Sequence, residues 1–180
     1  MPLISIGGGC HMQEEMIEIV DTEGSTIGIR RRSEVHGNPS LLHKVVHVLV
    51  FNDVGNLLLQ KRSMNKDVAP GKWDTSVGGH VSPGEDLKTA ALREMKEELG
   101  IILEDIEPLY SYIHSDSQER ELVFSYRCKH NGPFPFDRYE IDKVAFWSID
   151  EIRKSIGSGL FSGHFESEMT NYFWFKQELI

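Results

Sequence analysis

The sequence predicts an α+β fold, an α/β/α sandwich in which a central mixed β-sheet lies between helices. Strand-like and helix-like runs follow one another in mixed order, which favours a mixed sheet covered by helices. Residues 45–51 form a nearly continuous apolar run, as expected of a central buried strand. A set of apolar residues recurs at helical spacing and predicts a helix with one apolar stripe. They are Leu87, Ala91, Met95 and Leu99.

The N-terminal half is expected to supply four strands. Met16–Val20 and Thr26–Arg31 should form a hairpin around the turn residues 21–24. The central strand at residues 45–51 should then turn directly into a further strand at residues 57–60. This half therefore contributes the centre of the sheet and a hairpin beside it.

The C-terminal half alternates strands with helices. The expected elements are strands at residues 109–114, 122–128 and 144–147 and helices at residues 150–156 and 166–179. The last helix carries a group of large apolar side chains, which are Met169, Phe173, Trp174 and Phe175. We expect this group to pack in the core rather than to stack on nucleic-acid bases.

Composition limits the class of protein. We assign one domain to residues 15–180, preceded by a flexible N-terminal leader at residues 1–14. No run of about 18 apolar residues predicts a membrane span. The two cysteines, Cys10 and Cys128, form no disulfide framework, which favours the cytoplasm. The formal net charge of −9 argues against a nucleic-acid partner, whereas formation of a homodimer stays open.

Three glutamates carry the first chemical signal. Glu94, Glu97 and Glu98 are spaced i, i+3 and i+4, so they share one face of the predicted helix. Carboxylates gathered in this way repel one another unless a divalent cation lies among them. Mg²⁺ and Mn²⁺ prefer oxygen ligands, and Mg²⁺ commonly joins carboxylates to substrate phosphates. Glutamates are also good helix formers, so the three residues alone would fit a solvated helix end better.

The residues around the glutamates favour the chemical interpretation. The stretch resembles the Nudix box at every defined position: Gly79, five residues, Glu85, seven residues, and then Arg93, Glu94, Met95, Glu97, Glu98, Gly100 and Ile101. A match at so many restricted positions is a specific signal. It identifies the chain as similar to the Nudix superfamily, whose fold is the sandwich described above.

The resemblance implies a role for each residue of the box. Three of them would be metal ligands, namely Glu94, Glu97 and Glu98. Arg93 would pair with Glu85 and hold the box loop rather than touch substrate. Gly78 or Gly79 would bring a backbone carbonyl close to the metal, because glycine allows close backbone approach.

A second group of side chains combines histidines with two more carboxylates. His36 and His43 precede the central strand, and His80 lies in the box loop. Glu119 and Glu121 are two residues apart, so in a strand they point to the same side. Each histidine alone would fit a surface or hydrogen-bonded role better than a ligand role. Together, imidazole and carboxylate suit Mn²⁺, Zn²⁺ or Fe²⁺ better than Mg²⁺.

Longer segments resemble one branch of the superfamily, the type I isopentenyl-diphosphate isomerases. The segments are SEVHGNPSLLHKVVHVLVFN, LLLQKRSMNKDVAPGKWDTSVGGH and ERELVF, within a similarity that covers about residues 18–147. In those isomerases three histidines and two glutamates hold one metal, and the positions fall here on His36, His43, His80, Glu119 and Glu121. The basic residues that hold the diphosphate there fall on Arg32, Arg62 and Lys66. Arg62 would offer a bidentate fork and Lys66 a compact charge, although solvated strand ends are the plain alternative.

One departure from the isomerases changes the expected reaction. They need a cysteine in the pair of residues before the box-loop histidine, where this chain has Gly78 and Gly79. Glycine cannot donate a proton to an isoprenoid carbon. The isomerases also lose most acids of the box, whereas this sequence keeps every one. The chemistry therefore resembles that of a hydrolase on an isomerase-like frame.

We predict a metal-dependent hydrolase that cleaves a diphosphate linkage in a nucleoside diphosphate derivative or a related small phosphorylated metabolite. Mg²⁺ or Mn²⁺ would stabilise developing charge and activate the attacking water, whose proton Glu98, Glu94 or Glu121 would take. The rivals are an isopentenyl-diphosphate isomerase, a non-catalytic diphosphate-binding protein and an RNA-directed enzyme, which the net charge disfavours. Substrate choice is expected to lie in the loops at residues 115–120, 131–139 and 157–165.

Overall fold

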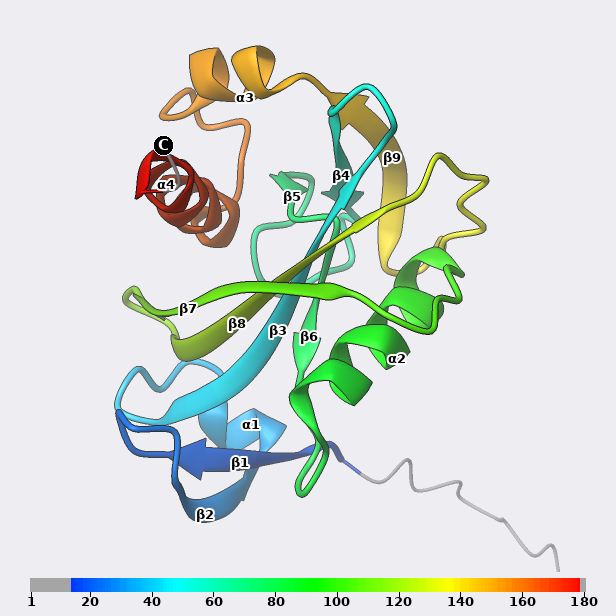
Figure 1. The fold of residues 1–180 in the computed structure, drawn as a ribbon. Helices are drawn as coiled ribbons and strands as arrows, with labels where there is room; N and C mark the ends of the chain where they lie inside the picture. The colour runs from blue at the N-terminus through cyan, green and yellow to red at the C-terminus, as the bar shows by residue number, and fades with distance from the viewer. Residues whose placement is uncertain (1–13, 179–180) are drawn as a thin grey trace, which may run out of the picture.

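A nine-stranded mixed β-sheet forms the centre of the computed structural model, which describes residues 14–178 (Figure 1). The first elements are β1 (Met16–Val20), β2 (Thr26–Arg31), α1 (Arg32–Val35), β3 (Leu42–Phe51), β4 (Leu57–Arg62), β5 (Trp73–Asp74) and β6 (Val77–His80). They are followed by α2 (Leu87–Leu99), β7 (Glu107–Ser115), β8 (Arg120–Lys129), β9 (Ile141–Trp147), α3 (Ile149–Ser155) and α4 (Gly163–Glu178). The predicted leader and Cys10 lie outside the described residues, apart from Glu14.

Strand β3 is the strand to which most of the sheet is attached. It runs parallel to β8 along its whole length. Its other edge pairs in turn with β1, β6 and β4, all antiparallel, and β9 pairs with β4. The register places His43 beside Glu121 of β8 and Val45 beside His80 of β6. The start of β3 is therefore where side chains from several strands can meet.

Each face of the sheet has its own hydrophobic core. Val46 and Val48 of β3 pack with Met95 of α2 on one face. Leu49 packs with Met169 of α4 on the other face. Successive residues of a strand point to opposite faces, so the continuous apolar run of β3 serves both cores. Figure 1 shows α2 and the α3–α4 pair on opposite sides of the sheet, which confirms the predicted sandwich.

Helix α2 is held in position at both ends and along one face. The Asp86 side chain caps its start by accepting a hydrogen bond from the backbone N–H of Thr89 at 3.2 Å. Gly100 ends it with a left-handed φ of 66°. Its buried residues are Ala90, Ala91, Met95 and Leu99. This buried stripe sets the rotation of the helix and thereby the direction in which its glutamates point.

Three short elements were not predicted from the sequence: α1, β5 and β6. They contain two to four residues each, too few for a recognisable period. Strand β6 contains Gly78 and Gly79, which have little intrinsic strand preference, and it forms because it pairs with β3. Pairing with neighbouring strands also extends the predicted strands at their polar ends. The strand predicted at residues 122–128, for example, is Arg120–Lys129 in the structure.

The predicted core packing of the last helix is wrong for one residue. Met169 is fully buried, and Phe175 packs against Tyr110 with ring centres 5.1 Å apart. Trp174, in contrast, is 61% exposed. It lies on the side of α4 that faces away from the sheet, a position that the clustered aromatic sequence did not reveal.

A buried carboxylate connects α4 to the sheet. Glu168 accepts hydrogen bonds from four side chains, which are His47 at 2.8 Å, Tyr110 at 2.6 Å, Tyr112 at 2.9 Å and Ser125 at 2.8 Å. Burial alone would raise the pKa of Glu168, but these donors, His47 foremost, lower it. His164 lies one turn earlier on the same helix face. The network therefore also holds His164 in place.

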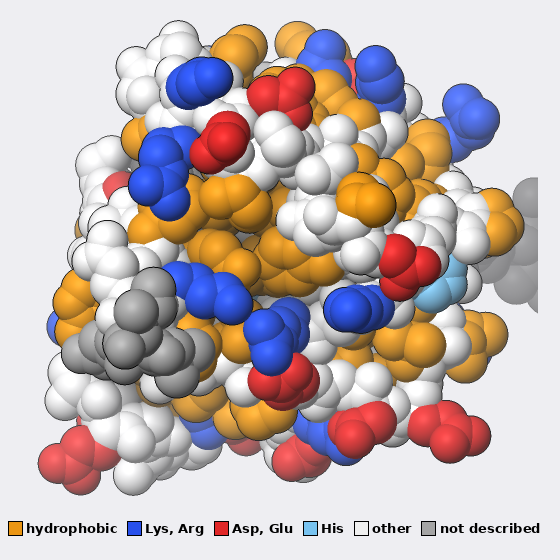
Figure 2. All heavy atoms as spheres, turned by 45° about the horizontal axis from the view of Figure 1, so that its top comes forward, with side chains coloured by type: hydrophobic (Ala, Val, Ile, Leu, Met, Phe, Trp, Pro, Cys, Tyr) orange, Lys and Arg blue, Asp and Glu red, His pale blue; other side chains and the backbone are white. Residues whose placement is uncertain are grey.

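One face of the molecule carries both hydrophobic and charged side chains (Figure 2). Figure 2 shows hydrophobic side chains near the centre of one face, bordered by Lys and Arg. A cavity of about 1230 Å³ lies at the end of β3 and β8 and is lined by Phe51, Tyr126 and Cys128 among others. Within residues 14–178, no helix is long and apolar enough to cross a membrane.

Candidate active site

One cavity of about 810 Å³ brings the two predicted groups of side chains together. Its walls carry the box glutamates, Glu94, Glu97 and Glu98, and four members of the histidine–glutamate group, His36, His80, Glu119 and Glu121. The fifth member, His43, is buried beside it, with its ring centre 5.4 Å from that of His80. Side chains that the sequence separates by more than 80 residues thus face a single space.

Arg93 is bound within the box. Its Nε and Nη2 donate to the two carboxylate oxygens of Glu85, both at 2.9 Å. Nη2 also donates to the backbone carbonyl of His80 at 3.0 Å, and Nη1 donates to Glu94 at 2.6 Å and to Glu97 at 3.2 Å. Arg93 therefore ties the box loop to the helix and orients the neighbouring glutamates.

Gly79 allows β6 to pass close to Glu94. A Cβ atom placed on Gly79 would lie 2.1 Å from the carboxyl carbon of Glu94 and within 2.5 Å of both its oxygens. Only a residue without a side chain leaves this space free. The glycine of the box thus determines where the Glu94 carboxylate can lie.

Glu98 lies half-buried next to Gly78. Its Oε2 accepts hydrogen bonds from Gln60 Nε2 at 3.0 Å and from the Gly78 backbone N–H at 3.3 Å. Burial and then the negative charge of Glu94 raise the pKa of Glu98 from 4.5 to about 8. Burial likewise raises the pKa of Glu94, whereas the Glu97 side chain is 57% exposed. Two adjacent carboxylates that resist ionising together are suited to share a cation.

We expect Glu98→Gln to stabilise the metal-free protein increasingly as pH rises. The pKa of Glu98 is raised on folding from 4.5 to about 8, so its favourable contribution is complete below pH 4.5 and is lost as pH rises through 8. We compare the free energy of unfolding of wild type with that of the variant. Between pH 4.5 and pH 8, the wild-type value minus the variant value should fall by on the order of a few kcal/mol. Urea unfolding in chelator at several pH values measures it. A difference independent of pH, as expected for the exposed control Glu104→Gln, would contradict the assignment.

His36 connects strands β6 and β8 through its two ring nitrogens. Nδ1 lies 2.7 Å from Glu119 Oε1, and Nε2 lies 3.2 Å from Nε2 of His80. Nδ1 of His80 in turn pairs with Glu15 at 3.0 Å. Two imidazole Nε2 atoms that face each other at this distance can both bind one cation, while a carboxylate holds the Nδ1 atom of each ring.

Several buried atoms of the same group lack a hydrogen bond. His43 Nε2 and Glu121 Oε2 have no hydrogen-bond partner among the described residues, and His43 Nε2 lies 3.9 Å from Glu121 Oε1. Burial lowers the pKa of His43, which favours the neutral imidazole that can ligate a metal. A buried polar atom without a partner costs about 1–3 kcal/mol. A cation among these atoms would satisfy them.

The structure adds His164 to the group, a residue that the sequence analysis did not select. His164 lies in the first turn of α4, and its Nε2 is 3.3 Å from both Glu119 Oε2 and Glu121 Oε2. Burial would lower the pKa of His164, but these glutamates raise it to about 11. No sequence motif marks the residue, because only the packing of α4 brings it to the cavity.

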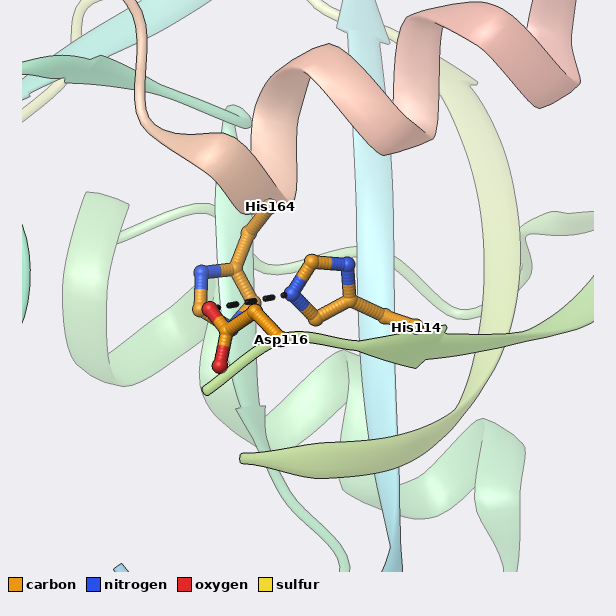
Figure 3. Close-up of side chains that lie close together, drawn as sticks. All are labelled: His114, Asp116 and His164. Carbon is orange, nitrogen blue, oxygen red and sulfur yellow. Dashed lines mark ion pairs between the residues drawn. The ribbon is translucent and has the colours of Figure 1, made fainter. Parts of the chain in front are cut away.

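Two further residues surround His164 (Figure 3). His114 comes from β7 and Asp116 from the loop that follows it, and both reach toward the start of α4. His114 Nε2 is 3.5 Å from Asp116 Oδ2, and the rings of His114 and His164 are 4.3 Å apart between centres. The sequence predicted no ligand role for His114 or Asp116 and placed Asp116 in a loop expected to govern substrate choice.

The three basic residues predicted to bind phosphate also line the cavity. Each has a carboxylate partner: Arg62 pairs with Asp74 at 3.2 Å, Arg32 with Glu15 at 3.5 Å, and Lys66 with Glu140. A phosphate group that enters the cavity would therefore have to share these cations with the protein's own carboxylates.

The comparisons with known proteins identify the family. The NUDIX domain model matches residues 41–163. The chain belongs to the Nudix family. The isopentenyl-diphosphate Delta-isomerase of Streptomyces avermitilis is 33% identical over 156 residues, which cover 83% of this chain and 79% of that protein. The uncharacterized Nudix hydrolase YfcD of Escherichia coli K12 is 30% identical over 138 residues, 77% of this chain and 76% of YfcD. The crystal structure of DR0079 from Deinococcus radiodurans superposes with a TM-score of 0.77 at 23% identity and covers 87% of this chain and 98% of DR0079.

These relatives confirm the predicted family and its resemblance to the isomerases. The protein is an enzyme of the Nudix hydrolase family, whose members generally cleave pyrophosphate bonds in nucleoside diphosphate derivatives. The cavity contains the two glycines that the sequence places before His80. Gly78 and Gly79 line it, whereas Cys128, the free cysteine of the described residues, lines the other cavity.

The residues of this Nudix cavity fit a divalent cation, which the family generally uses. Carboxylates outnumber lysines and arginines in the lining by ten to three. A diphosphate is itself an anion, so cations are needed before it can enter such a space. The oxygen ligands of the box suit Mg²⁺ or Mn²⁺, and the buried histidine and glutamate atoms without partners suit a transition metal.

Proposed function

We propose that this Nudix enzyme hydrolyses a diphosphate linkage in a small molecule such as a nucleoside diphosphate derivative, with Mg²⁺ or Mn²⁺. One observation supports this most. The complete set of box carboxylates lines a single cavity together with three basic side chains and four members of the histidine–glutamate group. A diphosphate in this cavity would meet both cation ligands and guanidinium or ammonium groups.

The proposed ligands of the box cation are Glu94, Glu97 and Glu98. When bound, the cation neutralises phosphate oxygens and activates the attacking water. Arg93 contributes by holding Glu94 and Glu97 in place, and Gly79 contributes by leaving room for Glu94. The proposed ligands of the second site are His36, His43, His80, Glu119 and Glu121.

Among the three candidates for the general base, the geometry favours Glu98. Its Oε2 is fixed by Gln60 and Gly78, so the carboxylate is oriented and its hydrogen bonds to described residues leave Oε1 for the proton. Glu94 is engaged by Arg93, and Glu121 is buried beside His164. Glu98 is therefore the group that we expect to take the proton of the attacking water.

Arg62, Lys66 and Arg32 would bind the phosphates. The side chain of Arg62 is oriented by its bond from Nε to the carbonyl of Val68 at 2.8 Å and by Asp74. Such a fixed guanidinium binds a phosphate oxygen with little loss of entropy. Because each basic group already pairs with a carboxylate, we expect phosphate to bind weakly without the divalent cation.

The test is a panel of phosphorylated small molecules incubated with purified protein and Mg²⁺ or Mn²⁺. It contains nucleoside diphosphates, dinucleotides, nucleotide sugars and isoprenoid diphosphates. Phosphorus NMR should show a monophosphate and the remaining phosphorylated half, with one oxygen from labelled water. Chelator and the Glu98→Gln variant serve as controls that should stop the reaction. Binding without turnover across the panel would contradict hydrolysis.

One alternative activity has direct support from a comparison, because the Streptomyces avermitilis relative is named an isopentenyl-diphosphate Delta-isomerase. The isoprenoid arm of the panel separates the two activities. Interconversion of isopentenyl and dimethylallyl diphosphates without phosphate release would favour isomerisation. We expect hydrolysis instead, because neither Gly78 nor Gly79 offers an acidic group to the cavity.

A further inference from the structure

Glu119 and Glu121 each present their two oxygens to different histidines. Glu119 directs Oε1 to His36 at 2.7 Å and Oε2 to His164 at 3.3 Å. Glu121 directs Oε1 to His43 at 3.9 Å and Oε2 to His164 at 3.3 Å. The pair of glutamates thus lies between two sets of imidazoles. His36, His43 and His80 lie on one side of the two glutamates, and His164 lies on the other side.

The contacts of His164 have the spacing of metal ligands. A tetrahedral zinc ion with bonds of about 2.0–2.1 Å separates its ligand atoms by about 3.3–3.4 Å. His164 Nε2 lies 3.3 Å from both glutamate oxygens, which matches this separation. His164 Nε2 and Glu121 Oε2 are also buried without a hydrogen bond among the described residues. A cation at the centre of these three atoms would satisfy all of them.

Two more side chains of a metal-binding type lie next to His164. Asp116 is fixed by its Oδ1, which accepts hydrogen bonds from the backbone N–H groups of Gln118 at 2.7 Å and Glu119 at 2.8 Å. Its Oδ2 faces His114 Nε2, a buried atom that likewise has no hydrogen bond to any described residue. Ligand atoms of His114, Asp116 and His164 (Figure 3) all lie within 4.8 Å of one another, and so do those of Glu119, Glu121 and His164.

We propose that His164, Glu119 and Glu121 hold a second transition-metal ion, with His114 and Asp116 lying beside His164. Glu121, whose oxygens face His43 and His164, would bridge it to the ion expected at His36, His43 and His80, giving a carboxylate-bridged pair of ions. The mixture of imidazole and carboxylate selects Mn²⁺, Zn²⁺ or Fe²⁺. Paired ions in enzymes lie about 3.5–4 Å apart, a distance that a bridging carboxylate can span. This pair of ions is separate from the box cation, and its presence does not depend on which reaction the enzyme performs.

The experiment counts zinc ions in the protein without substrate. Excess Mg²⁺ occupies the oxygen ligands of the box, Zn²⁺ is added, and crystals are measured at the zinc absorption edge. Wild type should show two zinc peaks about 3.5–4 Å apart on either side of Glu121. His164→Ala should keep the peak at His36 and lose the other. His130→Ala, a histidine outside this cavity, should keep both.

One zinc peak in wild type would overturn the proposal, and so would two peaks in His164→Ala. His164 would then serve only as a charged partner of the glutamates. If the variant does not fold, the wild type decides by electron paramagnetic resonance, with excess Mg²⁺ still occupying the box and Mn²⁺ in place of Zn²⁺. A spin-coupled signal supports a pair of ions, and the signal of isolated Mn²⁺ opposes it. Because no turnover is measured, failure of the proposed hydrolysis leaves this result unchanged.

Discussion

The Glu98→Gln variant is expected to fold and to lose about 10²- to 10⁴-fold in kcat for the diphosphate substrate. Glutamine has nearly the same size, and its amide oxygen can still accept the hydrogen bonds from Gln60 and Gly78. It can neither take a proton from water nor offer a charged oxygen to a cation. Adding Glu97→Gln should lower kcat further, because a second charge leaves the same helix face.

The matched control for this loss is Glu104→Gln, which changes an exposed glutamate just after α2. Steady-state kinetics at saturating Mg²⁺ or Mn²⁺, together with thermal unfolding, separates lost catalysis from lost structure. The control should retain full activity. If the double variant Glu97→Gln, Glu98→Gln turned over within about tenfold of wild type with metal present, the box glutamates would have no part in the reaction.

Gly79→Ala is expected to lower activity by about 10²-fold with little change in stability, since a displacement of about 1 Å at a reacting group can have this effect. The new methyl group would lie 2.1 Å from the carboxyl carbon of Glu94. Glu94 is flexible at that end, so its carboxylate moves and the backbone of β6 stays. The variant should also need more Mg²⁺ for half-maximal activity, because one proposed ligand is displaced.

Gly28→Ala provides the matched control for this substitution. A Cβ atom there would meet Arg30 Nη1 at 3.6 Å, an ordinary contact, in a strand outside the cavity. Both variants should unfold within a few degrees of wild type, and only Gly79→Ala should lose activity. Full activity of Gly79→Ala at wild-type Mg²⁺ concentrations would show that the position of Glu94 is not required.

Much of the fold followed from local patterns. The apolar run of β3 and the stripe of α2 have periods that only a buried strand and an amphipathic helix explain. The hairpin of β1 and β2 appears with the predicted bounds, Met16–Val20 and Thr26–Arg31. Elements that form only by pairing with another strand were not predicted. Strand β6, which contains Gly78 and Gly79, exists because β3 offers it a hydrogen-bonding edge.

The sequence by itself determined the family and the content of the box, because helix geometry relates Glu94, Glu97 and Glu98 through their spacing alone. It also indicated that the histidine–glutamate group belongs together, through a resemblance rather than through spacing. Only the tertiary structure decided that both groups line one cavity. It alone brought His164 to Glu119 and Glu121, 45 and 43 residues away in the chain. Contacts between distant residues depend on sheet register and helix packing, which no local period of the sequence encodes.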